Sequence, residues 1–146
     1  MTILIIDNSV FLREKLVKAF YEIDNTLLIR EESTFDSGES AFNSYNPDLV
    51  ILEIDLKSNG GIALLRKMKR TSPASVVIIF TDYSTEEFKL KYLQAGADYF
   101  FDKCKEYREI LEVVRNLVIH KKLNKSCTSN DEKTFSQPAF GKYWFE

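Results

Sequence analysis

The chain has 146 residues, a length that favours a single domain with an ordinary hydrophobic core. Hydrophobic residues make up 45% and charged residues 29% of the sequence, which is too apolar for a disordered chain. The net charge of −2 disfavours a nucleic-acid-binding surface, and no apolar run approaches the roughly 20 residues of a membrane span. The first residues also lack the basic start of a secretory signal. We therefore expect a cytoplasmic protein that binds neither nucleic acid nor membrane.

Short apolar runs alternate with segments of helical apolar spacing along the whole chain. Fully apolar runs of this length are typical of strands that are buried on both faces of a parallel sheet. The pattern predicts five strands, at residues 3–6, 27–30, 49–52, 76–80 and 99–101. It predicts a helix after each strand. The first two helices span 12–23 and 39–45, the third carries Leu64, Leu65 and Met68, a fourth lies between the last two strands, and the last is marked by apolar residues from Ile110 to Val118.

Start and stop signals accompany several of these segments. Ser9 is expected to cap the first helix, and Ser84 with Glu87 three residues later predicts a capping box for the fourth. Pro47 is expected to end the second helix, and Gly96 the fourth.

Alternating strands and helices predict an α/β fold with a parallel sheet covered by helices on both faces. Ligand sites in such sheets lie beyond the carboxyl ends of the strands. The polar residues at those ends are Asp7, Asn8, Glu53, Asp55, Thr81 and Lys103. We therefore expect these side chains to form one site.

The last part of the chain differs in composition. From about Lys121 onward the apolar period fades into a polar, linker-like stretch, so we predict a domain over residues 1–122 and a tail over 123–146. The tail carries an aromatic cluster, namely Phe135, Phe140, Tyr143, Trp144 and Phe145. Either these residues form a disordered end, or they dock on the domain or on a partner.

The order of the strand-end residues resembles that of two-component response-regulator receiver domains. Asp7-Asn8-Ser9 resembles the acidic pair of the family, and residues 47–53 resemble the segment that ends in its phosphoacceptor aspartate. Thr81 matches the switch threonine, and residues 95–103 match the fifth-strand region with its aromatic residue and lysine. The resemblance covers roughly residues 2–122 and implies a flavodoxin-like, doubly wound sheet of five strands, in the order 2-1-3-4-5, with five helices.

The resemblance also indicates altered phosphorylation chemistry. Glu53 stands at the phosphoacceptor position, one methylene longer than aspartate, and Asn8 replaces a metal-holding acid. The metal positions Asp7, Asn8, Glu53 and Asp55 should therefore bind Mg²⁺ weakly or not at all, and we expect no cofactor and no enzymatic activity. The matched switch residues are Thr81, Phe100 and Lys103.

Our main hypothesis is that the Glu53 carboxylate reaches Lys103 and Thr81 in place of the missing phosphoryl oxygens. It would then hold the receiver constitutively in an active-like arrangement. Phe100 should then lie inward. Alternatively, Glu53 and Lys103 form an ordinary polar pair in a degenerate site, or phosphate is accepted at Asp55.

Cys104 stands where the family usually has proline after the lysine, in a cis peptide. Because a cis bond before a residue other than proline costs about 2.5–4 kcal/mol, we predict a trans Lys103–Cys104 bond and a reshaped loop. Cys104 beside a lysine also allows a reactive thiol, although a small loop residue is the simpler interpretation.

The resemblance implies a stand-alone receiver-like protein in phosphorelay signalling. It would act by binding a protein partner, either a sensor kinase or a downstream target, as a monomer or as a homodimer through the fourth helix, fifth strand and fifth helix. One alternative is a working receiver with weakened Mg²⁺-dependent phosphotransfer. Another is a flavodoxin-like nucleotide or flavin binder, but the turn at residues 7–9 lacks the glycines that allow close approach of a phosphate.

Overall fold

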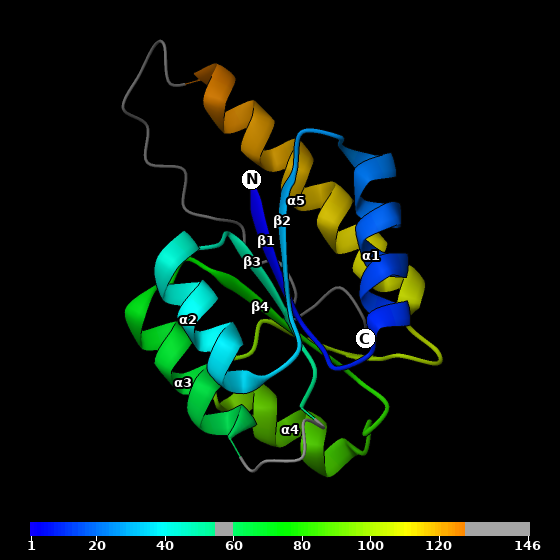
Figure 1. Ribbon diagram of the computed structural model, residues 1–146, viewed down its shortest axis with the longest axis vertical. Helices are drawn as coiled ribbons and strands as arrows, with labels where there is room; N and C mark the ends of the chain where they lie inside the picture. The colour runs from blue at the N-terminus through cyan, green and yellow to red at the C-terminus, as the bar shows by residue number, and fades with distance from the viewer. Residues whose placement is uncertain (55–59, 128–146) are drawn as a thin grey trace.

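The fold is a five-stranded parallel sheet, seen in a computed structural model that describes residues 1–54 and 60–127 (Figure 1). The sheet order is β2-β1-β3-β4-β5, as the resemblance implies. The strands are β1 (Thr2–Ile6), β2 (Leu28–Glu32), β3 (Leu49–Leu52), β4 (Val76–Thr81) and β5 (Tyr99–Asp102). This confirms the doubly wound α/β fold.

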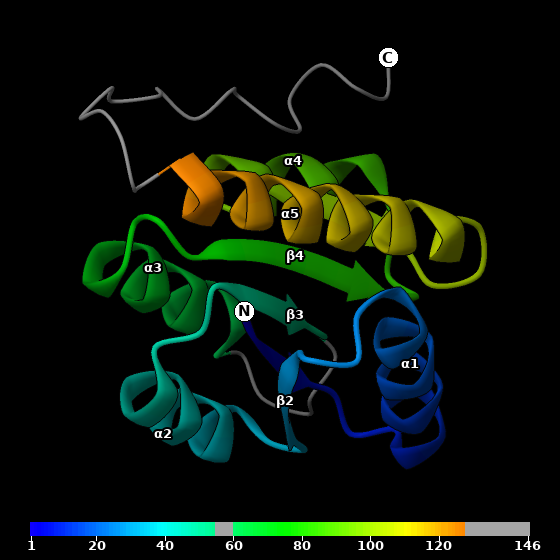
Figure 2. The same ribbon diagram turned by 90° about the horizontal axis from the view of Figure 1, so that it is seen from above.

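Five helices cover the two faces of the sheet (Figures 1 and 2). They are α1 (Val10–Ile23), α2 (Phe35–Tyr45), α3 (Gly61–Thr71), α4 (Glu86–Gln94) and α5 (Tyr107–Cys127). Apolar side chains of α1 and α5 pack against one face, and those of α2, α3 and α4 pack against the other. Each face therefore has its own buried cluster, with the apolar strands β1, β3 and β4 between them.

Several predicted caps are present. The Ser9 side chain accepts a hydrogen bond from Leu12 N at 3.2 Å, and Gly96 follows α4 with a φ of +115°, a conformation that favours glycine. The capping box at Ser84 is wrong, because the N-cap of α4 is Thr85, which accepts from Phe88 N at 3.3 Å. The Ser84 hydroxyl contacts Asp102 instead.

Two helices extend beyond their predicted limits. α2 begins at Phe35, four residues before the predicted start, because Thr34 caps it by accepting from Ser37 N at 3.1 Å. α5 continues to Cys127, so the linker-like interpretation of residues 121–127 is wrong and the predicted domain boundary after residue 122 falls within a helix. Lys121 pairs with Asp48 and Lys122 with Asp24, and these ion pairs join the last turns of α5 to the rest of the domain.

Two sequence predictions fall on residues outside the described ranges, namely the role of Asp55 and the position of the aromatic residues at 135–145. Within the described part of the chain, none of the helices is long and apolar enough to cross a membrane.

Candidate functional site

The register of the sheet brings the predicted site residues to one edge. Ile6 of β1 pairs with Leu52 of β3, so Asp7 and Glu53 follow neighbouring strands at the same level. The Glu53 N–H donates to Ile6 O at 2.9 Å and extends this pairing by one residue. On the other side, Lys103 follows β5, and its N–H donates to Thr81 O at 3.0 Å.

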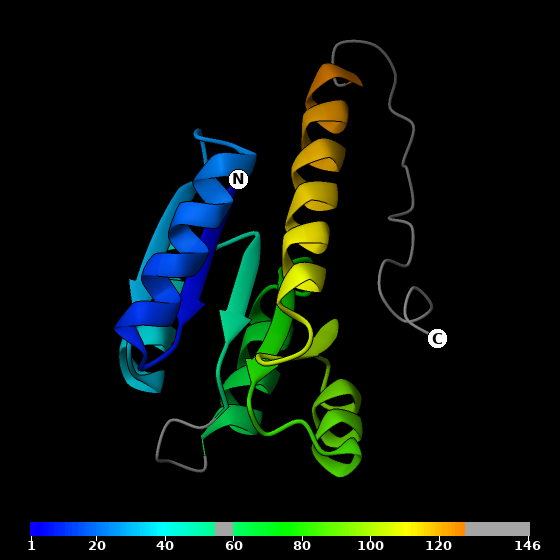
Figure 3. The same cartoon turned by 90° about the vertical axis from the view of Figure 1, so that its right-hand side faces the viewer.

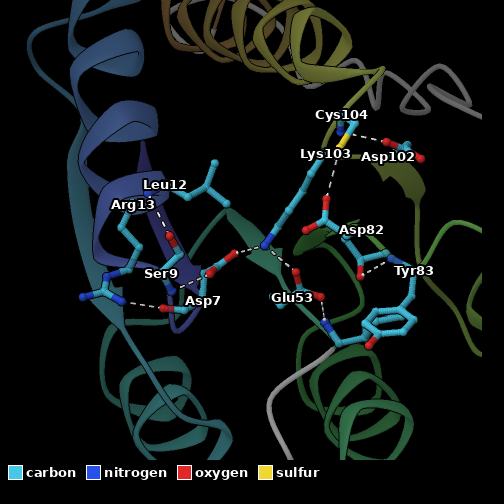
Figure 4. A network of polar contacts seen from close by, with 12 residues as sticks. Asp7, Ser9, Leu12, Arg13, Glu53, Asp82, Tyr83, Asp102, Lys103 and Cys104 are labelled. Carbon is cyan, nitrogen blue, oxygen red and sulfur yellow. Dashed lines mark hydrogen bonds and ion pairs between the residues drawn. The ribbon is translucent and has the colours of Figure 1, made fainter.

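Lys103 joins the two acidic side chains through its ammonium group (Figure 4). Its Nζ lies 2.7 Å from Asp7 Oδ2 and also forms an ion pair with Glu53 Oε2. Only 3% of the Asp7 side chain and 4% of the Glu53 side chain are exposed, against 13% of Lys103. The expected contact between Glu53 and Lys103 is therefore confirmed, as a buried bridge with two anions and one cation.

The electrostatics of this bridge keep Lys103 charged. Burial alone lowers the pKa of the ammonium, but hydrogen bonds to Asp7 and Glu53 and the charges of both carboxylates outweigh burial, so the pKa of Lys103 rises above its ordinary value. Lys103 therefore stays charged throughout the neutral pH range.

Backbone groups hold the two carboxylates in place. Asp7 Oδ1 accepts from Ser9 N at 2.8 Å, and Glu53 Oε1 accepts from Ile54 N at 2.7 Å. Each side chain thus uses one oxygen for its own loop and turns the other toward Lys103.

Arg13 is a site residue that the sequence analysis missed. Its guanidinium donates to the backbone carbonyl of Asp7 and pairs with Glu31 Oε1 at 3.3 Å, so it ties α1 to the ends of β1 and β2. Its position near the start of an expected helix, six residues after Asp7, was the available signal, because Glu31 is distant in sequence.

Thr81 and Phe100 lie where the resemblance places them. Thr81 is fully buried, and its hydroxyl accepts from Tyr83 N at 3.1 Å within its own loop. The contact of Glu53 with Thr81 stays a prediction. Phe100 is 4% exposed and packs near Tyr92, with ring centroids 6.3 Å apart, so the expected inward position is confirmed.

The loop after β5 has a distinct anchor in Asp102. The described residues contain no cis peptide, so the predicted trans bond between Lys103 and Cys104 is confirmed. Asp102 Oδ1 accepts from Cys104 N at 2.7 Å and from Lys105 N at 3.1 Å, while Oδ2 accepts from the Ser84 hydroxyl. A carboxylate therefore shapes this loop, and Ser84 links it to the loop after β4. Asp102 was not singled out from the sequence, although it directly follows the strand predicted at 99–101; the observed β5 includes it as its last residue.

Cys104 is exposed, and its thiol lies 3.5 Å from Asp82 Oδ1. The hydrogen bond to Asp82 and the charge of that carboxylate raise the pKa of the thiol. A raised pKa lowers the fraction of thiolate, which favours the loop-residue interpretation over a reactive thiol.

The described donor set does not fit the divalent cation that the family uses. The ammonium of Lys103 lies between the Asp7 and Glu53 carboxylates, and Asn8 is neutral and exposed. Among residues 1–54 and 60–127, no cluster of three or more His, Cys, Asp or Glu side chains is arranged to hold a metal. Hard cations such as Mg²⁺ prefer several carboxylate oxygens, and here one ammonium already pairs with both acids.

Comparisons with known proteins agree with the fold. Among curated proteins, a cyclic di-GMP phosphodiesterase of Thermotoga maritima is 29% identical over 140 residues, covering 92% of this chain and 37% of that protein. The response regulator GacA of Pseudomonas syringae is 26% identical over 116 residues, covering 77% of this chain and 53% of that protein. The chain thus spans between about a third and about a half of these relatives.

Solved structures share the architecture. The receiver domain of a DNA-binding response regulator from Colwellia psychrerythraea has a TM-score of 0.73 at 21% identity and covers 81% of this chain and 98% of its own. A CheY-like receiver domain protein from Methanospirillum hungatei has a TM-score of 0.69 at 23% identity and covers 88% of this chain and 98% of its own. The family model described as the response regulator receiver domain matches residues 3–115. The chain therefore belongs to the response regulator receiver domain family.

Proposed function

We propose that this receiver domain signals without an aspartyl phosphate, by presenting a fixed surface to a protein partner. The members of this family are signalling domains that interact with proteins such as kinases and effectors. The observation that carries the proposal is the buried bridge from Asp7 through Lys103 to Glu53. In this proposal Glu53 replaces the phosphoacceptor aspartate, and its carboxylate supplies to Lys103 the negative charge that a phosphoryl group supplies in a working receiver.

The geometry of Glu53 supports this role. Both carboxylate oxygens have partners, since Oε1 accepts from Ile54 N and Oε2 pairs with Lys103. In-line attack on a phosphoryl donor requires a free, correctly placed oxygen, and a displacement of about 1 Å can lower such a rate on the order of 10²-fold. The glutamate is therefore placed to hold Lys103 and poorly placed to accept phosphate.

The inward Phe100 fits a domain that is set in one state. Phe100 lies in the cluster beneath α4, and Lys103 follows it by three residues on the same strand end. We infer that Thr81, Phe100 and Lys103 keep the switch roles of the family while their arrangement is fixed by Glu53. The surface offered to a kinase, a downstream target or a second copy would then comprise α4, β5 and α5, where Phe88 and Leu90 are 38% and 58% exposed.

A labelling experiment tests the proposal. The purified protein is incubated with acetyl phosphate and Mg²⁺, and its intact mass is measured. We expect no gain in mass, and a stable gain of one phosphoryl group would refute the proposal, whether the group is on Glu53 or on Asp55.

A matched variant provides the positive control. The double change Glu53→Asp with Asn8→Asp restores both the length and the charge of the family's acidic set. We expect this variant to bind Mg²⁺ and to gain one phosphoryl group, while the wild-type protein gains none under the same conditions. A double variant that folds and remains unlabelled would show that something other than Glu53 and Asn8 disables the site.

The other functions considered from the sequence lack support in the structure. Weak phosphotransfer requires a metal set that the described residues do not supply. Flavin or nucleotide binding is not favoured by the family match over residues 3–115.

A further inference from the structure

α1 and α5 lie side by side on one face of the sheet (Figure 3). Side chains of both helices line a groove between them. The groove has a volume of about 530 Å³ and is lined by the second half of α1 and by α5 from Leu111 to Lys122. Its wall residues are Ala19, Glu22, Ile23, Leu111, Arg115, Val118, Ile119 and Lys122. The groove wall is therefore mostly apolar, with the two cations Arg115 and Lys122 and one anion, Glu22, among the apolar side chains.

The α5 side of this groove is exposed apolar surface. Ile119 is 54% exposed and Leu123, one turn later on the same helix, is 58% exposed. The Arg115 and Lys122 side chains beside them are 52% and 66% exposed. Apolar surface flanked by cations is a suitable contact for aromatic rings, which combine a large apolar area with an affinity of the ring face for cations.

The chain itself carries such a ligand immediately after α5. Residues 128–146 follow Cys127 directly, and five of them are aromatic, all between residues 135 and 145. The segment begins with Thr128-Ser129-Asn130-Asp131, a composition typical of turns. A turn at this point would direct the aromatic residues back along α5.

The distances permit this return. Val118 lies nine residues before Cys127 on α5, which corresponds to about 14 Å along the helix, and Leu111 lies about 24 Å away. Phe140 follows Cys127 by 13 residues, which span up to roughly 43–47 Å when extended. The aromatic residues at 140–145 therefore have ample reach to the whole groove.

We propose that the aromatic segment 140–145 docks intramolecularly in the groove between α1 and α5. The covalent connection favours this occupant over a separate partner, because a ligand joined to its site through a short connection has an effective concentration on the order of mM. Any free protein with a similar apolar segment competes against that concentration.

Trp144 makes the proposal measurable in the full-length protein, because it is the only tryptophan in the chain. We expect its fluorescence to be blue-shifted, and its quenching by acrylamide weaker, in the native protein than in urea. The substitution Ile119→Glu places a charge in the groove at a position that is already half exposed, so folding should be retained by circular dichroism. It should shift both signals toward their values in urea.

Leu28→Glu is the matched control, since Leu28 is 65% exposed on the edge strand β2, outside the groove. This variant should leave the Trp144 signals unchanged. A Trp144 that is as accessible in the native protein as in urea would overturn the proposal, and so would equal effects of the two substitutions. Protection of Trp144 that disappears on dilution would also overturn it, because the groove would then bind the segment of a second copy.

Discussion

Replacing Lys103 with methionine tests the bridge at the strand ends directly. Methionine keeps a flexible side chain of similar length and removes only the charge and the hydrogen bonds. In the wild-type protein one ammonium serves two carboxylates that are 3% and 4% exposed. In the variant those carboxylates face each other without a cation.

The expected loss of stability follows from this burial. Removing one partner of a buried ion pair costs about 3–5 kcal/mol, because the remaining charge is left desolvated and unpaired. The site lies at the edge of the sheet, and Lys103 itself is 13% exposed, so we expect the lower end, about 3 kcal/mol. With a urea dependence of about 1–3 kcal/mol per M, the unfolding midpoint should fall by roughly 1–3 M.

The measurement is urea unfolding at pH 7, with Lys67→Met as the control. Lys67 pairs with Glu39 at 3.0 Å, but these side chains are 57% and 38% exposed, so this variant should lose less than about 1 kcal/mol. Because the folded-state pKa of Lys103 is raised, its stabilisation is complete below the ordinary value of 10.5 and is lost as pH rises through the folded-state value. If Lys103→Met lost no more stability than Lys67→Met, the ion pairs of Lys103 could not be what holds the Asp7 and Glu53 side chains in their arrangement.

Two further predictions follow from other buried polar groups. Burial, and to a smaller extent the charge of Asp98, raises the pKa of Tyr99 to about 12. An alkaline absorbance titration should therefore show one tyrosine that ionises only near pH 12. The variant Tyr99→Phe should lack that step. The stabilisation by neutral Tyr99 is complete below about pH 10 and is lost as pH rises through 12, and ionisation of every tyrosine near pH 10 would contradict this. Ser84→Ala should lower the free energy of unfolding by about 1 kcal/mol at pH 7, because the hydroxyl donates to the Asp102 carboxylate. The hydrogen bond from Ser84 is the largest influence on the pKa of Asp102, and it lowers that pKa. The stability lost on Ser84→Ala should therefore become smaller as pH falls below 3.8. An equal loss of unfolding free energy at pH 7 and at pH 2 would exclude this mechanism.

The strands and the site edge were predictable because their signals are local. The run at residues 49–52 is apolar throughout, and all four residues are buried in β3. β1 and β3 each end where their apolar run ends, so the following residues, Asp7 and Glu53, fall at one edge by the geometry of a parallel sheet. Strand β2 was placed less well because it is an edge strand whose exposed residues weaken the apolar run.

The end of α5 was not predictable from periodicity, because tertiary ion pairs stabilise it. Residues 121–126 are mostly exposed and polar, so their pattern resembles a linker. The partner of Lys121 is Asp48, 73 residues earlier, and that pairing exists only once the sheet has formed. The predicted N-cap of α4 was wrong because of another tertiary contact. Both Ser84 and Thr85 suit an N-cap position, and only the contact of Ser84 with Asp102 distinguishes them.

The fold of a receiver domain and the altered chemistry that we propose are compatible, because the fold and the charges of the site depend on different residues. The fold needs apolar runs and correct register, and neither is affected by one methylene at Glu53 or by an amide at Asn8. Binding of a divalent cation requires carboxylates in addition to those that pair with Lys103. Glu53→Asp alone would shorten one arm of the bridge without adding charge, and Asn8→Asp alone would add charge while Glu53 still engages Lys103. Each single change should therefore restore little, and recovery of labelling should require both, which is the non-additivity expected of residues that share one partner.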